Sequence, residues 1–411
     1  MGKLPMRARV ATTIGGAAGR MSRLTGRGDG SVIGGVLSLR VEPDLLRLLS
    51  VDRQVVLVSA TNGKTTTTRL ITAALTALGQ EVASNAFGAN MAAGLASALG
   101  RAPNAPFAAL EVDERHLPDV IEATVPKVVV LMNLSRDQMD RAAEIWLVAR
   151  RWRESLAKAG CHVIANADDP LITWAAGSAR RVTWVAAGQR WQEDSWCCPV
   201  CGSHLRRDEL GWRCAECSFA RPPARWVLNG TTVVDAGGRV TELALELPGG
   251  ANRSNAVMAL AVADFFGASV DQVLPGMRRV RSVAGRYTRR ERHGKQLRLL
   301  LAKNPAGWLE AFDVLEPAPG PVLLSVNANG PDGRDTSWLW DVDYRLLRGR
   351  PVYVAGQRRV DLAVRLEADE VIFDLVSGID DAIGRVRSPA LDVIANYTAF
   401  QQIRAALGRG E

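Results

Sequence analysis

The run Thr61-Asn62-Gly63-Lys64-Thr65-Thr66-Thr67-Thr68 carries the residue types of a phosphate-binding loop. It joins the apolar run Val55–Val58 to Leu70–Leu78, where apolar residues recur at helical spacing, so we predict a strand–turn–helix unit. Backbone N–H groups of such a turn and the helix N-terminus face a bound anion. We expect Lys64 to reach the terminal phosphates, where it acts in catalysis, and the Thr65 hydroxyl to contact Mg²⁺. The candidate nucleotide-binding residues of the loop are Thr61, Asn62, Gly63, Lys64, Thr65 and Thr66.

The loop departs from the general pattern at one position, because Val58 stands where a glycine is usual. An ordinary glycine turn between a strand and a helix is therefore the alternative interpretation. The Gly-Lys-Thr order in a strand–turn–helix setting favours nucleotide binding.

Acidic and polar residues follow two further apolar runs. Glu111 and Asp113 lie at or just after the end of the predicted strand Phe107–Val112, and the polar cluster Asn133–Arg141 follows the predicted strand Val128–Leu131. An acid at the carboxyl end of a strand beside a phosphate loop is well placed to hold Mg²⁺ or its water. A solvated loop acid is the alternative for each carboxylate.

The cysteines indicate a metal site. Five of the six fall between Cys197 and Cys217, a clustering typical of metal ligation in a reducing compartment. The two C-x-x-C pairs supply four thiolates for tetrahedral Zn²⁺, which closes the coordination shell and predicts a structural zinc. The candidate ligands are Cys198, Cys201, Cys214 and Cys217. Cys197 competes with Cys198 for this role, and we expect His204 to be a neighbour.

Charge alone does not select a function. The net charge is +8, and seven arginines fall within Arg278–Arg292. Such a balance suits nucleic acid, phosphorylated substrates, an anionic membrane face or simply a solvated basic surface. The apolar stretches are too short to span a bilayer, and the Arg-rich first 30 residues lack the apolar core of a secretory signal.

The elements that must position these residues alternate in the manner of a parallel α/β sheet. We expect a basic segment packing on the ATPase domain (1–50), an ATP-binding α/β domain (51–284) interrupted by a zinc ribbon (195–226), and a smaller C-terminal α/β domain (285–411). The predicted strands are Val55–Val58, Phe107–Val112, Val128–Leu131, His162–Ala165, Leu297–Leu301, Val322–Val326, Val352–Val354 and Val371–Phe373, with a short β-rich stretch at Trp226–Leu247. The predicted helices include Pro118–Ala123, Glu144–Lys158 and Asn255–Phe266.

The order of these motifs, together with Asn166-Ala167-Asp168-Asp169-Pro170, resembles the Mur ligase superfamily, whose members join amino acids to carboxylates through acyl phosphates. This chain has Asp137-Gln138-Met139-Asp140 where the superfamily usually has a histidine in place of Gln138. The inserted zinc ribbon and the motifs Lys303–Trp308 and Asp332–Asp343 resemble one branch, the MurT family of synthetase subunits of lipid II isoglutaminyl synthase.

The resemblance implies ATP-dependent amidation of the α-carboxylate of D-glutamate in the lipid II stem peptide, by a cytoplasmic protein at the inner face of the membrane. It implies that Thr65, Glu111 and Gln138 organise Mg²⁺. It further implies nucleotide contacts for Asn252, Asn255 and Arg286. A helix N-cap role is the alternative for each asparagine.

The source of ammonia follows from the cysteines. None of them lies in the Gly-x-Cys-x-Gly turn of a triad glutaminase, so we expect that this chain does not hydrolyse glutamine. The resemblance implies a separate glutaminase partner of the GatD type, to whose Cys–His pair this subunit lends an aspartate. Asp335 is the first candidate and Asp341 the second, with Asp332 and Asp343 competing. Trp338 and Trp340, at alternate positions, pave a sugar or partner surface or pack as a core strand.

Three other functions remain open. A zinc-ribbon P-loop ATPase that binds nucleic acid fits the basic charge, but aromatic residues are scarce and no RNA-binding signature is present, so we expect no nucleic-acid partner. A folylpolyglutamate-type ligase needs a folate pocket and a second-metal lysine, neither of which is evident. A non-catalytic zinc scaffold does not explain the Lys64-Thr65 pair.

Overall fold

The computed structural model describes residues 4–24, 30–85, 89–137, 144–209, 211–281, 287–315 and 319–408. The chain divides into two compact units. The first unit comprises Met1–Leu134, Ile145–Leu247 and Ala251–Arg281, and the second comprises Ser135–Glu144, Pro248–Gly250 and Ser282–Glu411. The second unit therefore includes a short segment, 135–144, that follows a strand of the first.

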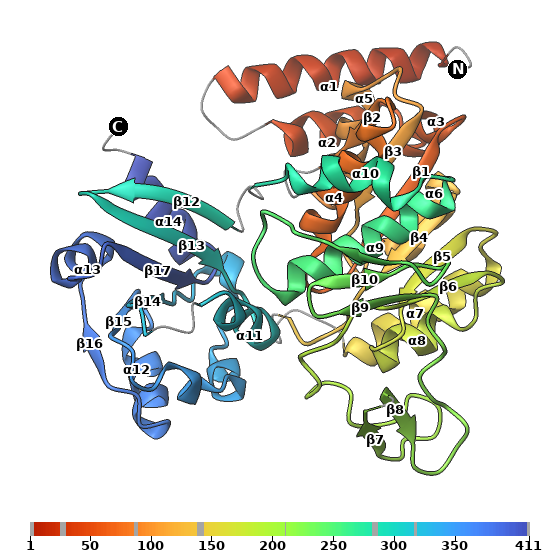
Figure 1. Cartoon of the computed structure of the whole chain (residues 1–411). Coiled ribbons are helices and arrows are strands. Elements are labelled where there is room, and N and C mark those ends of the chain that lie inside the picture. The colour runs from red at the N-terminus through yellow and green to blue at the C-terminus, as the bar shows by residue number, and fades with distance from the viewer. Residues whose placement is uncertain are drawn as a thin grey trace. The chain divides into compact units, whose positions relative to one another are not determined.

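A nine-stranded sheet, in the order β11-β10-β9-β6-β5-β4-β1-β3-β2, forms the centre of the first unit (Figure 1). Its strands are β1 Gln54–Ser59, β2 Val82–Ser84, β3 Phe107–Glu111, β4 Val128–Leu131, β5 His162–Asn166, β6 Val182–Ala186, β9 Trp226–Asn229, β10 Thr232–Val234 and β11 Val240–Glu242. In this order, each strand from β9 to β2 pairs in parallel with its neighbour. At the other end of the sheet, β10 pairs antiparallel with both β9 and β11. The α/β class predicted from the alternating pattern is confirmed.

Helices cover this sheet because their apolar residues recur on one face. In α7, for example, Val148, Ala149, Trp152 and Leu156 are buried at spacings that bring them to one side of a helix. The strand β1 is buried along Val55–Val58, as expected of a parallel strand covered on both faces. The helices are α4 Lys64–Ala77, α5 Ala92–Arg101, α6 Leu117–Thr124, α7 Ile145–Lys158, α8 Pro170–Ala176, α9 Gly250–Phe265 and α10 Val270–Arg278.

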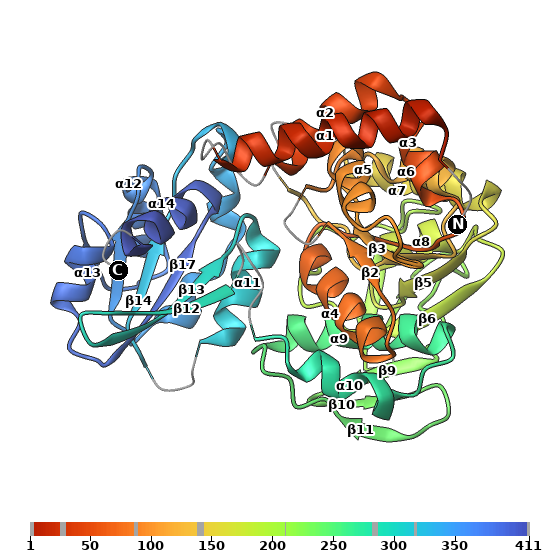
Figure 2. The ribbon, with the colours of Figure 1, turned by 90° about the horizontal axis from the view of Figure 1, so that it is seen from above.

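Three helices precede β1: α1 Met6–Leu24, α2 Ser31–Val41 and α3 Leu45–Ser50. Figure 2 shows α1 and α2 side by side within the first unit, and α1 also contacts α5. The basic segment expected at 1–50 therefore consists, in its described part, of three helices. Among the described residues, none of the helices combines the length and the apolar character that crossing a membrane requires.

The cysteine-rich insertion forms a hairpin of β7 Leu205–Asp208 and β8 Gly211–Cys214, separate from the large sheet. Its small buried core consists of Cys198, Leu205, Trp212 and Cys214, with Cys217 and Phe219 packed against it. The Trp212 indole donates a hydrogen bond to the Ala167 carbonyl oxygen (3.0 Å), which ties the hairpin to the loop after β5.

The second unit has its own six-stranded sheet, in the order β12-β13-β17-β14-β15-β16. Its strands are β12 Tyr287–Arg292, β13 Lys295–Leu301, β14 Val322–Ser325, β15 Val352–Ala355, β16 Phe373–Leu375 and β17 Ala390–Ala395, and its helices are α11 Pro305–Val314, α12 Arg359–Ala368, α13 Ile379–Arg385 and α14 Tyr397–Gly408. Leu297, Leu323 and Val393 are fully buried in its core. This unit is the smaller α/β domain expected near the C-terminus.

Two local predictions are wrong. The strand predicted at Val371–Phe373 lies at Phe373–Leu375 instead. Trp338 and Trp340 do not alternate in a strand, because Ser337–Asp341 is a 3₁₀ helix, η2. Trp338 contacts the ring of buried Trp308 with centroids 6.1 Å apart, whereas Trp340 is largely exposed. A 3₁₀ turn separates the two side chains in this way because it has about three residues per turn.

Candidate functional site

The phosphate loop leaves β1 at Ser59 and enters α4 at Lys64. Gly63 lies in the left-handed region (φ 87°), and a Cβ atom there would lie 2.5 Å from the Asn255 Oδ1 atom. Only glycine fits both requirements, because other residues are strained at this φ and would clash. The backbone is therefore shaped as a tight turn at the N-terminus of a 14-residue helix, the arrangement that favours a bound anion.

Asn133, at the end of β4, holds the loop. Its Oδ1 atom accepts a hydrogen bond from the Asn62 N–H (2.9 Å), and its Nδ2 atom donates to the Asn62 carbonyl oxygen (3.1 Å). The Thr61 N–H donates to the Asn133 carbonyl oxygen (3.0 Å). The sequence places Asn133 in a polar cluster but does not reveal this role. The direct pairing of β4 with β1 brings the two strand ends together.

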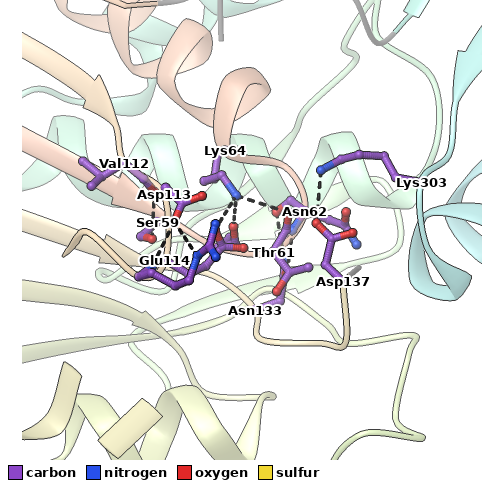
Figure 3. A network of polar contacts seen from close by, with 12 residues as sticks. Ser59, Thr61, Asn62, Lys64, Val112, Asp113, Glu114, Asn133, Asp137 and Lys303 are labelled. Atoms are coloured by element: carbon purple, nitrogen blue, oxygen red, sulfur yellow. Dashed lines mark hydrogen bonds and ion pairs between the residues drawn. The ribbon is translucent and has the colours of Figure 1, made fainter. Parts of the chain in front are cut away.

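Lys64 is buried and paired. Its Nζ atom lies 3.1 Å from Glu114 Oε2, and it also donates to the carbonyl oxygens of Ala60 and of Thr61 (3.3 Å for the latter; Figure 3). Sequence reasoning did not single out Glu114, although it stands three residues after Glu111 in one acidic run. The lysine expected at the phosphates thus has a carboxylate counterion within the first unit.

Glu111 lies beside the loop because β3 pairs with β1, with Glu111 opposite Val58. The Asn85 side chain fixes its backbone: Oδ1 accepts from the Glu111 N–H and Nδ2 donates to its carbonyl oxygen, both at 2.9 Å. Glu111 is buried, and among the described residues its Oε2 atom has no hydrogen-bond partner. A buried carboxylate oxygen without a donor fits a hard cation such as Mg²⁺. Asp113 instead accepts a hydrogen bond from the Arg115 N–H, within its own loop.

Other expected nucleotide contacts divide into three groups. Thr65 and Thr66 are buried in the first turn of α4. Asn252 and Asn255 lie inside α9, which begins at Gly250, so neither is the N-cap residue that was the alternative interpretation. Asn255 is buried and faces Gly63, while Asn252 is half-buried. Gln138 and Arg286 lie outside the described residues.

Asp169 shows a different use of a buried acid. It caps α8, where its Oδ1 atom accepts from the N–H groups of Leu171 and Ile172 (2.9 and 3.1 Å), and its Oδ2 atom accepts from the Leu134 N–H (2.9 Å). Complete burial raises the pKa of Asp169 to about 6 in spite of these donors. The Asn133–Leu134 segment is thus anchored to α8 by a side chain that is easily protonated.

The four predicted zinc ligands converge. The Sγ atoms of Cys198, Cys201, Cys214 and Cys217 all lie within 4.8 Å of one another, with Cys198–Cys217 at 3.7 Å and Cys201–Cys214 at 3.4 Å. Tetrahedral zinc with bonds near 2.3 Å places sulfur atoms about 3.8 Å apart, so the donor set fits this ion. Cys197 is exposed, and the His204 ring contacts Trp196 at 5.6 Å between centroids.

In the second unit, Asp137 contacts the motif at Lys303–Trp308. The Lys303 Nζ atom lies 3.2 Å from Asp137 Oδ2, and the Asn304 Nδ2 atom donates to Oδ1 at 3.3 Å (Figure 3). Asn304 is buried and caps α11 by accepting from the Gly307 N–H (2.9 Å). This part of the polar cluster after β4 therefore has partners in the second unit.

The four C-terminal acids differ in their partners. Asp332 accepts from the Thr398 N–H (2.8 Å), Asp341 pairs with Arg136 (3.4 Å), and Asp343 pairs with Arg345 (2.8 Å). Asp335 is exposed and accepts from the N–H of Ser337 in its own turn (2.8 Å). Hydrogen bonds from Ser337 hold the pKa of Asp335 below its usual value, so its carboxylate is ionised near neutral pH.

A phosphate loop on a parallel sheet, followed by a separate α/β unit, defines a nucleotide-dependent ligase of the Mur type, and the comparisons agree. The Mur ligase middle domain matches residues 58–263, and the MurT ligase C-terminal domain matches residues 301–400. A Staphylococcus aureus protein named lipid II isoglutaminyl synthase (glutamine-hydrolyzing) subunit MurT is 30% identical over 434 residues, covering 98% of each chain. The chain belongs to the MurT family of the Mur ligase superfamily and is an ATP-dependent ligase.

Solved structures share the fold. A pseudomurein peptide ligase type C from Methanothermus fervidus superposes with a TM-score of 0.68 at 17% identity, covering 88% of this chain and 79% of that one. The Mycobacterium tuberculosis folylpolyglutamate synthase complexed with ADP gives a TM-score of 0.61 at 18% identity, covering 89% and 93%. These two structures therefore show the fold alone, which a pseudomurein peptide ligase and a folylpolyglutamate synthase share.

Proposed function

We propose that this chain is the synthetase subunit that amidates the α-carboxylate of D-glutamate in the stem peptide of lipid II, with ATP as the energy source and ammonia supplied by a glutaminase partner. The observation that carries the proposal is the end-to-end similarity to a relative whose name states this activity. The buried Lys64 and the phosphate loop support the ATP-dependent half of the reaction.

The reaction needs activation because a carboxylate does not react with ammonia. A carboxylate oxygen attacks the γ-phosphorus of ATP, the bond to ADP breaks, and an acyl phosphate forms. The ammonia lone pair then forms the C–N bond, the C–O bond to phosphate breaks, and the nitrogen loses a proton. Such catalysis depends mainly on positioning and on electrostatic stabilisation of the transferring phosphoryl group.

The first unit supplies those effects. The turn at Gly63 directs backbone N–H groups to the phosphates, and Lys64 stabilises their negative charge. Thr65 and Glu111 are the residues that would hold Mg²⁺, and the partnerless Glu111 oxygen supports this assignment. When bound, Mg²⁺ neutralises charge on the β- and γ-phosphates. Asn255, next to Gly63, is the better placed of the two asparagines for a nucleotide contact.

The cysteines support a separate source of ammonia. Burial raises the pKa of the Cys161 thiol, which makes it a poor nucleophile, and four other cysteines lie together in the thiol cluster. Of the four C-terminal acids, Asp335 is exposed, and its hydrogen bonds among the described residues lie within its own turn, so it is the preferred residue to orient a histidine of the partner. Asp341 and Asp343 are committed to arginines.

Three further assignments belong to the proposal. In the first, the thiols of Cys198, Cys201, Cys214 and Cys217 hold structural Zn²⁺ in a ribbon at 195–226. In the second, an ATP-binding domain extends over 51–284 and a C-terminal α/β domain over 285–411, and residues 1–50 pack on the ATP-binding domain. In the third, the reaction takes place at the inner face of the membrane, where the lipid-linked substrate resides.

Mass spectrometry of lipid II tests the proposal. The purified chain with ATP, Mg²⁺ and ammonium should yield amidated lipid II, and glutamine should replace ammonium only when a GatD-type glutaminase is added. If no mixture yields amidated lipid II although the chain still binds ATP, the proposal is contradicted. Glutamylation of a folate, or steeply salt-dependent DNA binding, would instead favour the two alternative functions.

A further inference from the structure

The helix α1 has its two faces reversed relative to an ordinary surface helix. Its buried residues are small: Ala8, Ala11, Gly15, Gly19 and Ser22. Its large apolar side chains point outward, with Met6 81%, Met21 67% and Leu24 88% exposed, and Val10 and Ile14 also exposed. An amphipathic helix of a globular protein normally buries the large residues and exposes the polar ones.

Close helix–helix contact explains the small inner face. A Cβ atom at Gly15 would lie 2.5 Å from the Gly34 carbonyl oxygen of α2, and one at Gly19 would lie 3.0 Å from the Gly30 carbonyl oxygen. The inner face therefore has no room for larger residues. Since α1 is fixed in this orientation, its opposite face, with Met6, Val10 and Ile14, is held outward.

The outward residues form a continuous stripe. At about 100° per residue, the five residues of the stripe fall within an arc of roughly 80°, opposite the buried face. The stripe consists of Met6, Val10, Ile14, Met21 and Leu24. Val32, Ile33 and Val36 of the neighbouring α2 are also at least one-third exposed, which adds apolar surface to the same helix pair.

The described charged residues of α1 itself are all arginines, although Arg7 lies 3.8 Å from Glu42 Oε2 beside the helix. Arg7, Arg9, Arg20 and Arg23 are exposed, and the sequence contains no acidic residue before Asp29. Arginines that flank an apolar stripe match the phosphates of anionic lipid headgroups, above an acyl boundary that accepts the apolar side chains.

We propose that α1 lies in the interface of an anionic membrane, with the stripe from Met6 to Leu24 inserted among the lipids and the arginines at the headgroup phosphates. The helix lies on the membrane and does not cross it. This goes beyond the proposed function, which requires only that the enzyme meet a lipid-linked substrate. It rests on the geometry and charge of α1 alone.

Vesicle flotation with the full chain tests the proposal. We expect the chain to float with phosphatidylglycerol-containing vesicles and not with phosphatidylcholine vesicles, and to be released by salt. The double variant Ile14→Ser/Met21→Ser should lower the partition coefficient roughly tenfold, and Arg9→Gln/Arg20→Gln should lower it roughly 20-fold. The control Ile372→Ser changes an isoleucine that is 90% exposed in the second unit and should leave binding unchanged.

Several results would overturn the proposal. These are the absence of wild-type binding to anionic vesicles, equal binding by Ile14→Ser/Met21→Ser, a wild-type dimer that this variant abolishes, or loss of glutaminase binding by the variant. Circular dichroism and ADP binding confirm that each variant is folded. Amidation of lipid II in detergent micelles separates the two proposals: its failure in the wild type contradicts the proposed function, whereas intact amidation without vesicle binding contradicts only the membrane role of α1.

Discussion

The Lys64 ammonium group and the Glu114 carboxylate form a largely buried ion pair, 3.1 Å apart, at the start of the helix that follows the phosphate loop. Their side chains are only 5% and 16% exposed, so the interaction is weakly screened by solvent. Glu114 therefore compensates the charge of Lys64 when no phosphate is near. An incoming nucleotide must compete with this carboxylate for the lysine.

Replacing Glu114 by glutamine should therefore strengthen nucleotide binding. In the absence of Mg²⁺, we expect Glu114→Gln to raise the affinity for ADP about three- to tenfold, because one negative charge near the phosphates is removed. Isothermal titration calorimetry measures the change, with Asp113→Asn as a matched control that should bind like the wild type. Weaker binding by Glu114→Gln would show instead that the carboxylate positions the lysine.

The partnerless oxygen of Glu111 gives a second prediction. Glu111→Gln should raise the Mg²⁺ concentration needed for half-maximal ATP turnover at least roughly tenfold, because a carboxylate is a better ligand for Mg²⁺ than an amide. The melting temperature should not fall, since the buried Oε2 atom accepts no hydrogen bond from the described residues and a buried polar atom without a partner destabilises the protein. Glu122→Gln, on exposed helix surface, is the control. An unchanged Mg²⁺ requirement would remove Glu111 from the metal site.

The thiol cluster allows a test with adjacent cysteines. Cys201→Ser should abolish binding of about one zinc ion per chain and increase hydrogen exchange throughout 195–221, because three thiolates no longer close the shell. Cys197→Ser should keep both the zinc and the protection. Elemental analysis and exchange mass spectrometry provide the two readouts. Zinc lost from Cys197→Ser and retained by Cys201→Ser would mean that the ligand set is misassigned.

Asp335 should separate the two nitrogen sources. With the glutaminase present, we expect Asp335→Asn to reduce glutamine-dependent amidation at least about a hundredfold, because the partner's histidine loses its orienting carboxylate. Amidation from free ammonium should remain. The matched variant Asp343→Asn should retain both activities, because Asp343 pairs with Arg345 within its own turn. A loss of ammonium-dependent activity in Asp335→Asn would place this residue in the synthetase step.

Asp169 predicts a specific pH dependence of stability. Its pKa of about 6 in the folded protein lies above the ordinary value of 3.8, so the folded state binds more protons than the unfolded state between these values. The stability that Asp169 contributes is present in full below the lower value and is lost as pH rises through about 6. From about pH 5 to about pH 7.5, the free energy of unfolding should fall by about 1 kcal/mol more in the wild type than in Asp169→Asn. Urea denaturation at both pH values measures this difference; a pH-independent difference contradicts it.

Local pattern sufficed to predict the centre of the fold. The apolar run at β1, the glycine turn and the helical spacing after it lie next to one another in the chain, and they form as predicted. The four cysteines of the thiol cluster also converge as predicted, because C-x-x-C spacing itself brings two thiols together. The long-range partners were not predictable: Glu114 lies 50 residues from Lys64, and only the pairing of β1 with β3 brings them into contact.

The arginine-rich stretch shows a different limit of sequence reasoning. The charge of the run Arg278–Arg292 indicates only a basic surface, but the part Tyr287–Arg292 forms β12. This strand lies at the edge of its sheet and pairs with β13. Exposed charges on an edge strand discourage pairing with other chains, which explains Arg289 and Arg290 without a ligand. Similarly, β9 to β11 extend the large sheet, whereas the sequence indicated only a short β-rich stretch, because strand order depends on contacts that local pattern does not encode.

The most direct test of the central claim follows oxygen from the substrate carboxylate. Lipid II labelled with ¹⁸O in the D-glutamyl α-carboxylate is incubated with the purified chain, ATP, Mg²⁺ and ammonium, and both the lipid and the released phosphate are analysed by mass spectrometry. An ATP-dependent amidating ligase predicts an amide product together with one ¹⁸O atom transferred to each phosphate, and the variant Lys64→Ala should produce neither. Amide formation with unlabelled phosphate would contradict the acyl-phosphate route, and ATP hydrolysis without amide would contradict the proposed function itself.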